Sequence, residues 1–154
     1  MRLTLHTDYA LRLLMLLAIE SDDQHTIEAV ARRYRISRNH LMKVAQTLAR
    51  AGLIESLRGR RGGLRLGRSA QKINLGDVVR ATEDSFALVE CFDRERNSCV
   101  VTPACGLRGP LDEALTAFFS VLDRYSLADL VTHPGSLRRM RRLLRDAGPA
   151  EARA

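Results

Sequence analysis

Two short helical patterns, separated by a tight turn, leave this chain few possible folds. The first, in the segment TIEAVARRYR, starts at Thr26 and places its apolar side chains on one face. The second follows Ser37, a good capping residue, and repeats its apolar residues at positions i, i+3, i+4 and i+7 before Gly52. The turn between them contains Arg35 and Ile36. Two short helices in this arrangement predict a helix-turn-helix.

The solvent-facing side of the second helix carries hydrogen-bond donors and almost no acids. Arginine and lysine suit guanine edges and phosphates, asparagine suits adenine, and the first residues of a recognition helix approach the bases most closely. A polar stripe is usually a solvated helix face, but the near absence of acids favours contact with DNA. We therefore expect DNA contacts from Arg38, Asn39, His40 and Lys43.

A glycine- and arginine-rich segment, LIESLRGRRGGLRLG, follows the helix pair. Its two short apolar-alternating runs, 53–57 and 64–66, predict a β-hairpin and therefore a winged helix. The predicted tip carries Arg58, Arg60 and Arg61, which could contact phosphates or enter a minor groove. Alone, this segment could be only a flexible turn, but its position after the helix pair favours contact with DNA.

The positive charge of the chain is concentrated in the same half. The net charge is +7, and residues 1–70 hold 13 basic and 6 acidic side chains, whereas residues 71–154 hold 12 of each. This surplus of positive charge, taken alone, could equally serve to keep the protein soluble. Its coincidence with the predicted winged helix favours double-stranded DNA as the partner.

The longest apolar stretch, YALRLLMLLAIE, belongs to a predicted buried helix that runs from an N-cap at Thr7 to about Ser21. It is too short to span a bilayer, and Asp8 and Arg12 argue against a signal peptide. We therefore expect a cytoplasmic protein with no membrane partner. The length of 154 residues and the apolar content of 45% are typical of one globular unit.

All three cysteines, Cys91, Cys99 and Cys105, lie in the segment ECFDRERNSCVVTPACG. In a reducing compartment, clustered thiols indicate metal or redox chemistry more often than disulfides. Structural zinc sites usually contain a close C-x2–4-C pair, which this segment lacks, so an iron–sulfur cluster is the better interpretation. A zinc-stabilised transcription factor and unligated, oxidant-sensing thiols stay open as alternatives. The missing C-x-x-C disfavours a thiol redox protein, and we expect no enzymatic activity.

Further helical patterns follow the predicted hairpin. NLGDVVRATED predicts a helix that leads directly into the cysteine segment. The next helix starts with Pro110 at its first position, and its apolar stripe is either intramolecular core or a dimer seam. We favour the seam, because winged-helix repressors read two half-sites with two-fold symmetry. The predicted seam consists of Leu111, Leu115, Phe118, Phe119 and Leu122. After the short helix SLADLV, Pro134 and Gly135 act as breakers.

These patterns predict a mostly α-helical protein with four parts. Residues 1–82 form a winged helix-turn-helix domain, and residues 83–109 form a cysteine-containing cluster loop. Residues 110–132 hold the long C-terminal dimerisation helix and the short helix after it. Residues 133–154 are predicted as a basic C-terminal tail of uncertain order.

Several segments resemble the Rrf2 family of winged-helix transcriptional regulators, over about residues 1–132. They are LTLHTDYALRLLM, SRNHLMKV, AGLIESLRGRRGGLRLG, the spaced cysteines, TPAC from Thr102 to Cys105, and LADLV from Leu127. The resemblance is strongest to the nitric-oxide-sensing repressors of this family. It implies a homodimeric DNA-binding repressor that senses nitric oxide through an iron–sulfur cluster and loses operator affinity when the cluster is nitrosylated.

The resemblance also implies a ligand set. The three cysteines would bind the cluster, of the 4Fe–4S rather than the 2Fe–2S type, and Asp8 of the partner subunit would be the fourth ligand. Without the resemblance, Asp8 would be interpreted as an acid that faces the positive end of the helix dipole. His6 and Glu90 are weaker candidates for the fourth ligand.

Two other kinds of regulator in the family stay open as alternatives. Cluster-biogenesis regulators use a histidine shortly after the last cysteine, whereas Gly106, Leu107 and Arg108 follow Cys105 here. Iron-responsive regulators strongly resemble the segment TEDSFALVECF, but they tend to have asparagine at the position of Asp8. Asp8 and the motif SRNH favour the nitric-oxide-sensing type.

Overall fold

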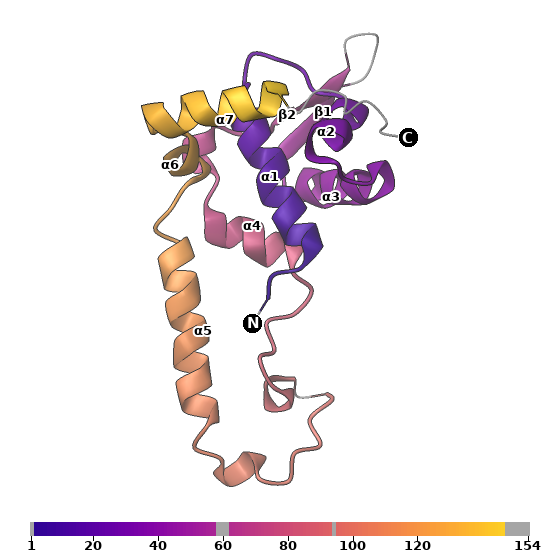
Figure 1. The fold of residues 1–154 in the computed structure, drawn as a ribbon. Helices are drawn as coiled ribbons and strands as arrows, with labels where there is room; N and C mark the ends of the chain where they lie inside the picture. Colours follow the sequence, from indigo (N-terminus) through magenta and orange to yellow (C-terminus); the bar gives the residue numbers. More distant parts are fainter. Residues whose placement is uncertain (1, 58–61, 94, 147–154) are drawn as a thin grey trace.

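The computed structural model describes residues 2–57, 62–93 and 95–146 (Figure 1). Its helices are α1 (Leu5–Ile19), α2 (Ile27–Tyr34), α3 (Arg38–Arg50), α4 (Leu75–Thr82), α5 (Arg108–Leu122), α6 (Leu127–Val131) and α7 (Pro134–Asp146). Short 3-10 turns are η1 (Ala70–Lys72), η2 (Glu90–Phe92) and η3 (Thr102–Ala104). Figure 1 shows α5 and the segment 83–107 extending away from the other elements, which form a compact head. The predicted mostly helical winged helix is confirmed.

Helix α1 lies at the centre of this head. It packs against α3, α4 and α6, and its side chains Leu13, Leu14 and Leu16 are completely buried. The predicted N-cap at Thr7 is wrong, because Thr4 caps the helix and accepts a hydrogen bond from the backbone N–H of Thr7. Among the described residues, none of the helices combines the length and the apolar composition that crossing a bilayer requires.

Helices α2 and α3 begin where the sequence predicts. The side chain of Thr26 caps α2, and the side chain of Ser37 caps α3. Between them Arg35 adopts a left-handed conformation with φ of 53°, and the N–H of Ile36 returns to the carbonyl of Ala31 at 2.9 Å. This closure ends α2 abruptly and lets α3 start within a few residues.

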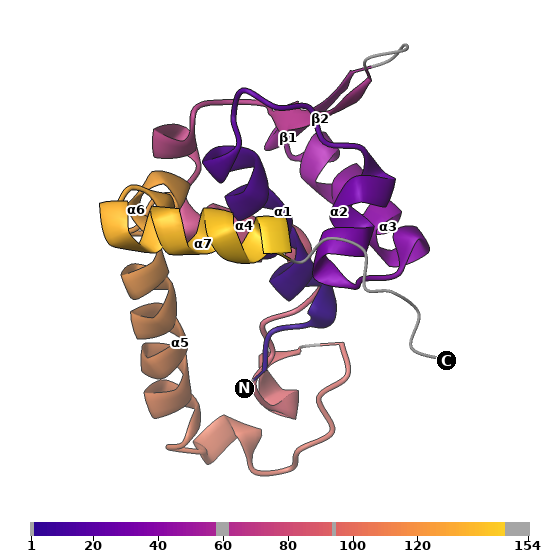
Figure 2. The same ribbon diagram turned by 45° about the horizontal axis from the view of Figure 1, so that its top comes forward.

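The strands β1 (Ile54–Leu57) and β2 (Gly63–Leu66) form the predicted hairpin. They are antiparallel, with Ile54 opposite Leu66 and Leu57 opposite Gly63. Ile54 and Leu64 are buried in the core that α1 and α3 share, so the pairing register also fixes the hairpin to the helix pair. The hairpin therefore projects from the head beside α2 and α3 (Figure 2).

A cluster of three threonines and one glutamate joins the start of α1 to the end of α4. The Glu83 carboxylate accepts hydrogen bonds from the Thr4 backbone N–H at 2.8 Å, the Thr4 hydroxyl at 3.0 Å and the Thr7 hydroxyl. Buried Thr82 donates to Thr7 at 2.9 Å. This Thr–Glu cluster, consisting of Thr4, Thr7, Thr82 and Glu83, lies where the cysteine-containing segment leaves α4.

Helix α5 is fastened to the head near its C-terminal end. Asp123, directly after the helix, forms a bidentate ion pair with Arg80 of α4, with N–O distances of 2.7 and 2.8 Å. The side chain of Asn74 donates to the Asp123 carbonyl at 2.7 Å. The helix starts at Arg108, two residues before the predicted start, so Pro110 lies in the first turn, where no intrahelical N–H donor is required.

The segment after His133, predicted as a basic tail of uncertain order, contains a helix, α7. Pro134 starts this helix instead of breaking the chain, in agreement with the preference of proline for the first helical turn. Leu137, Met140 and Leu144 pack against the core, and the Arg141 guanidinium donates to the Ile19 carbonyl at 2.9 Å. Residues 147–154 lie outside the described residues.

We predict that the Thr–Glu cluster stabilises the head in a pH-dependent way. Burial disfavours the charged form of Glu83, but hydrogen bonds from Thr7 and Thr4 outweigh it and hold the pKa of Glu83 below its ordinary value. The stabilisation is therefore present above the pKa of the unfolded chain and is lost as pH falls through the folded pKa. Glu83→Gln should lower the free energy of unfolding by about 1 kcal/mol at neutral pH.

Urea unfolding at neutral and acidic pH measures this difference. Asp84→Asn is the matched control, because it removes the neighbouring charge and Asp84 accepts no hydrogen bond from α1 within the described part of the chain. An equal loss of stability in both variants, or a Glu83→Gln deficit that persists in acid, would contradict the prediction.

Candidate DNA-binding face and cysteine loop

The exposed side of α3 keeps the predicted DNA-contacting residues near its N-terminus. Arg38 and Asn39, its first two residues, are exposed, and Lys43 is exposed one turn later. Ser37 caps the helix through the backbone N–H of His40, so the side chains of the first turn start from a fixed backbone. This places two side chains that suit base edges where a recognition helix approaches bases most closely.

His40 lies apart from the other three residues. Its ring is half-buried and stacks edge-on against Tyr9 of α1, with ring centroids 4.8 Å apart. The centroid of the His6 ring lies 6.1 Å from that of His40, and the His6 ring hydrogen-bonds the Thr47 hydroxyl of α3 at 3.1 Å. Burial, and then the nearby His40, lower the pKa of His6. In this chain His40 therefore packs between α1 and α3 and does not share the open face of Arg38, Asn39 and Lys43.

Arg38 has a partner that no local sequence pattern indicates. Its Nε donates to Glu28 Oε1 of α2 at 2.5 Å, and both side chains are more than half exposed. The two residues line a groove of about 310 Å³ between the helix pair and the hairpin, together with Met42 and Gln46 of α3. Glu28 is ten positions from Arg38, so only the geometry of the turn brings them together.

The predicted arginine tip would join the two strands of the hairpin. Arg58, Arg60 and Arg61 themselves lie outside the described residues. In the strands, Arg65 of β2 pairs with Glu55 of β1 at 2.6 Å across the exposed face. The hairpin is thus built as predicted, while the contribution of its tip to DNA binding stays a prediction.

The cysteine segment is held in place by short hydrogen-bonded turns. Cys91 lies in η2, Cys105 follows η3, and Cys99 is exposed between them. The Glu90 carboxylate binds the backbone N–H and the hydroxyl of Ser98, the latter at 2.6 Å. Asn97 accepts from the backbone N–H of Cys99 at 3.2 Å and pairs with the Thr102 hydroxyl. These contacts order the loop around the three thiols.

The three thiols fit an iron–sulfur cluster by their chemistry, because thiolates are the usual ligands of such clusters. All three are free, and each is at least partly exposed. In the part of the chain that the structure describes, no three histidine, cysteine, aspartate or glutamate side chains converge closely enough to hold a metal ion. The loop therefore supplies suitable donors on one segment without gathering them at one point.

The candidates for a fourth ligand are all engaged within the chain. Asp8 binds Arg12 through both carboxylate oxygens, at 3.0 and 2.6 Å, and is partly exposed. Glu90 is bound by Ser98, whose hydrogen bonds lower the pKa of Glu90. His6 is bound to Thr47. Asp8 carries the carboxylate of α1, and it can ligate only if it leaves Arg12.

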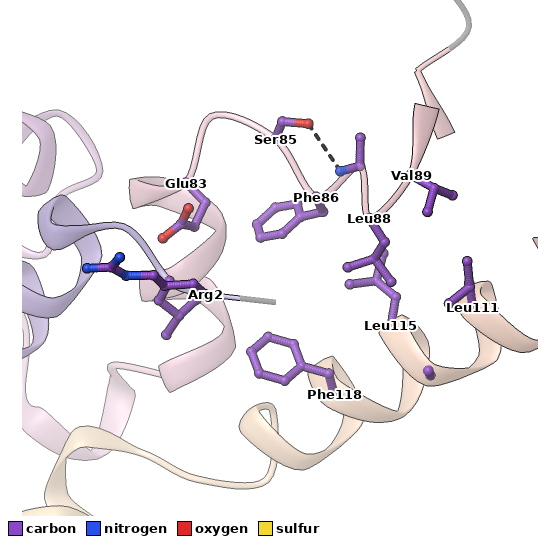
Figure 3. A pocket seen from close by; sticks show the side chains of 12 residues that line it. Arg2, Glu83, Ser85, Phe86, Leu88, Val89, Leu111, Leu115 and Phe118 are labelled. Carbon is purple, nitrogen blue, oxygen red and sulfur yellow. Dashed lines mark hydrogen bonds between the residues drawn. The ribbon is translucent and has the colours of Figure 1, made fainter. Parts of the chain in front are cut away.

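The apolar stripe of α5 packs in part against its own chain. Phe119 lies edge-on against Phe86, with centroids 4.8 Å apart, and the Arg80 guanidinium lies 4.4 Å above its ring. Leu111, Leu115 and Phe118 line a cavity of about 490 Å³ opposite Phe86 and Leu88 (Figure 3). All five stripe residues, Leu122 included, are half-buried in the single chain. The stripe is thus partly intramolecular, and its role as a dimer seam stays a prediction.

A family model and several known proteins match this chain. The model of Rrf2, described as an iron-dependent transcriptional regulator, matches residues 3–133. The HTH-type transcriptional regulator NsrR of Bacillus subtilis (strain 168) is 52% identical over 132 residues, which cover 85% of this chain and 90% of that protein. Protein aau3 of Rhizobium meliloti (strain 1021) is 49% identical over 131 residues, 85% of either chain.

Solved structures agree with this assignment. CymR, the global cysteine regulator of B. subtilis, superimposes with a TM-score of 0.69 at 27% identity, covering 86% of this chain and 98% of that one. IscR of T. potens shares the fold, with a TM-score of 0.67 at 22% identity over 99% of this chain and 94% of that one. The chain therefore belongs to the Rrf2 family of transcriptional regulators.

Proposed function

We propose that this protein is a homodimeric, DNA-binding repressor that responds to nitric oxide through an iron–sulfur cluster on the cysteine loop. The observation that carries the proposal is the position of three free thiols on a loop that leaves the head at the Thr–Glu cluster. The loop thus starts at a contact shared with α1, which packs against the proposed reading helix α3. The similarity to proteins named NsrR supports the same function.

The proposed reading head uses both parts of the winged helix. The N-terminal residues of α3 enter the major groove of an operator, with Arg38 and Asn39 at base edges and Lys43 near the backbone. The hairpin reaches the adjacent phosphates or minor groove through Arg58, Arg60 and Arg61. Two heads in one homodimer read two half-sites.

The proposed cluster site combines two chains. Cys91, Cys99 and Cys105 hold the cluster, of the 4Fe–4S type, and Asp8 of the partner subunit completes the set after leaving Arg12. A bound cluster supplies iron that a small ligand such as nitric oxide can reach, most readily at an oxygen-ligated position. The protein side chains bind the cluster, order residues 90–105 and pass a change in this loop to α1 through Glu83. Loss of this order weakens operator binding.

Replacing the proposed ligands should change cluster content in a graded way. Cys99→Ala removes a strong soft ligand from an exposed position and should abolish stable cluster incorporation. Asp8→Ala should keep iron but alter the absorption spectrum and the reaction with nitric oxide. Arg12→Ala is the matched control, because it removes the partner of Asp8 and should leave the cluster bound. Anaerobic purification followed by iron, sulfide and zinc analysis makes the measurement.

An Asp8→Ala protein with the parental spectrum and nitric-oxide response would exclude Asp8 as a ligand. Zinc without sulfide in the anaerobic parent protein would instead favour the zinc-stabilised alternative. Thermal melting of the cluster-free forms checks that the variants differ in ligation and not in folding.

The proposed reading face predicts different effects of two substitutions on α3. Asn39→Ala should lower the preference for the cognate operator by roughly 1–3 kcal/mol, because a base contact is lost. Arg50→Ala removes a charge from the last turn of the same helix and should weaken cognate and unrelated DNA alike. Fluorescence anisotropy with both duplexes distinguishes these outcomes. Unchanged base preference in Asn39→Ala would move the reading face away from the start of α3.

The proposed dimer seam can be tested without disturbing the packing of the single chain. Val121 of α5 is 43% exposed in one chain and borders the stripe, so we include it in the seam. Val121→Asp would bury a charge between subunits and should raise the dimer dissociation constant at least about tenfold. Ser120→Asp is the control, because Ser120 is exposed and lies on the face of α5 opposite the stripe. Light scattering that shows equal dimer content in both variants would place the seam elsewhere.

A further inference from the structure

The ion pair between Glu28 and Arg38 has a geometry that suits DNA recognition more than stability. Both side chains are more than half exposed, at 52% and 58%, and exposed ion pairs contribute little to folding. Glu28 lies in the first turn of α2 and Arg38 is the first residue of α3, so the pair bridges the two helices at the open face of the head. Hydrogen bonding by Arg38 lowers the pKa of Glu28, which keeps the carboxylate ionised.

The contact uses only part of the arginine fork. Arg38 donates through Nε to Glu28 Oε1 at 2.5 Å. A guanidinium has five N–H donors in a plane, so the Nη groups of Arg38 keep donors for a second acceptor pair. The O6 and N7 atoms of guanine form such a pair in the major groove, and arginine binds them through two parallel hydrogen bonds.

We propose that Glu28 is a specificity-determining residue that holds Arg38 in the orientation for reading guanine. This inference rests on the proposed function, because it requires α3 to enter the major groove. Arginine has a long, flexible side chain, and holding it in place before binding reduces the entropy lost in the complex. A carboxylate near DNA is otherwise unfavourable, because it repels phosphates. An orienting role and simple repulsion therefore predict opposite effects of removing Glu28.

The chain offers a matched control on the neighbouring element. Glu55 of β1 pairs with Arg65 of β2 at 2.6 Å, and these side chains are 49% and 55% exposed. Glu55→Ala therefore removes a similar charge from a similar ion pair, but not from the start of α3. Its effect should be the same on every DNA sequence.

The experiment measures operator binding by the full-length, cluster-loaded protein. The probes are the duplex that the parent protein selects from a random library, a set of duplexes in which each G·C pair is replaced by A·T, and an unrelated duplex. The variants are Glu28→Ala, Glu28→Gln, Arg38→Ala, Glu28→Ala with Arg38→Ala, and Glu55→Ala. Thermal melting verifies that each variant is folded.

Arg38→Ala should lose its preference for guanine at one position of each half-site. Glu28→Ala should lose preference at the same position, by roughly three- to tenfold, and bind unrelated DNA no more weakly than the parent. The double variant should resemble Arg38→Ala alone, because the two residues act as one unit. Glu28→Gln, which keeps a hydrogen-bond acceptor, should retain part of the preference.

Four results would overturn the inference. Glu28→Ala binding every sequence more tightly, with base preference intact, would show that Glu28 only repels phosphates. Loss of preference at a different position from Arg38→Ala would show that Glu28 reads a base itself. Unchanged preference in Arg38→Ala would contradict the proposed reading face as a whole. Loss in Arg38→Ala with none in Glu28→Ala would overturn only the role of Glu28.

Discussion

Burial of α1 on nearly all sides is the constraint on which the rest of the structure depends. Leu13, Leu14 and Leu16 are completely enclosed, and α3, α4, α6 and α7 pack around this helix. Close packing of this kind leaves little room for one element to move without its neighbours. The first turn of α1 is less enclosed: it carries His6 and Asp8, together with Thr7 of the Thr–Glu cluster. The start of α1 is therefore an edge of the head where a change outside can reach the core.

That edge lies between the proposed reading helix α3 and the cysteine loop. On one side, His6 and Tyr9 contact Thr47 and His40 of α3. On the other side, Glu83 binds Thr4 and Thr7 just before the cysteine segment begins. The ion pair of Arg80 with Asp123 adds a second link, from α4 to the end of α5. The cysteine loop, α1 and the proposed reading helix are thus joined by direct contacts, which gives the proposed repressor a physical route for its response.

The sequence correctly predicts the helix starts that depend only on neighbouring residues. Thr26 and Ser37 cap α2 and α3 as expected, because a side chain and a backbone N–H three residues later suffice. The same patterns place the cap of α1 at Thr7 instead of Thr4, because two threonines compete for this position and Glu83, distant in sequence, binds both.

Other features depend on tertiary structure. Pro134 reads as a helix breaker in the sequence, but the packing of Leu137 and Leu144 on the core supports a helix that starts there. The Glu28–Arg38 pair and the contact of Phe119 with Phe86 also depend on tertiary structure. The cysteine ligands stay a prediction, because within the described residues no three donor side chains converge on one point.

The most direct test of this account measures operator affinity and cluster absorption together. One anaerobic sample of the full-length protein is titrated with nitric oxide in the presence of labelled operator. The account predicts that operator affinity falls in step with the change in cluster absorption, and that the cluster-free protein binds weakly from the start. Bleaching of the cluster with unchanged operator affinity, or equal affinity of cluster-free and cluster-loaded protein, would contradict it.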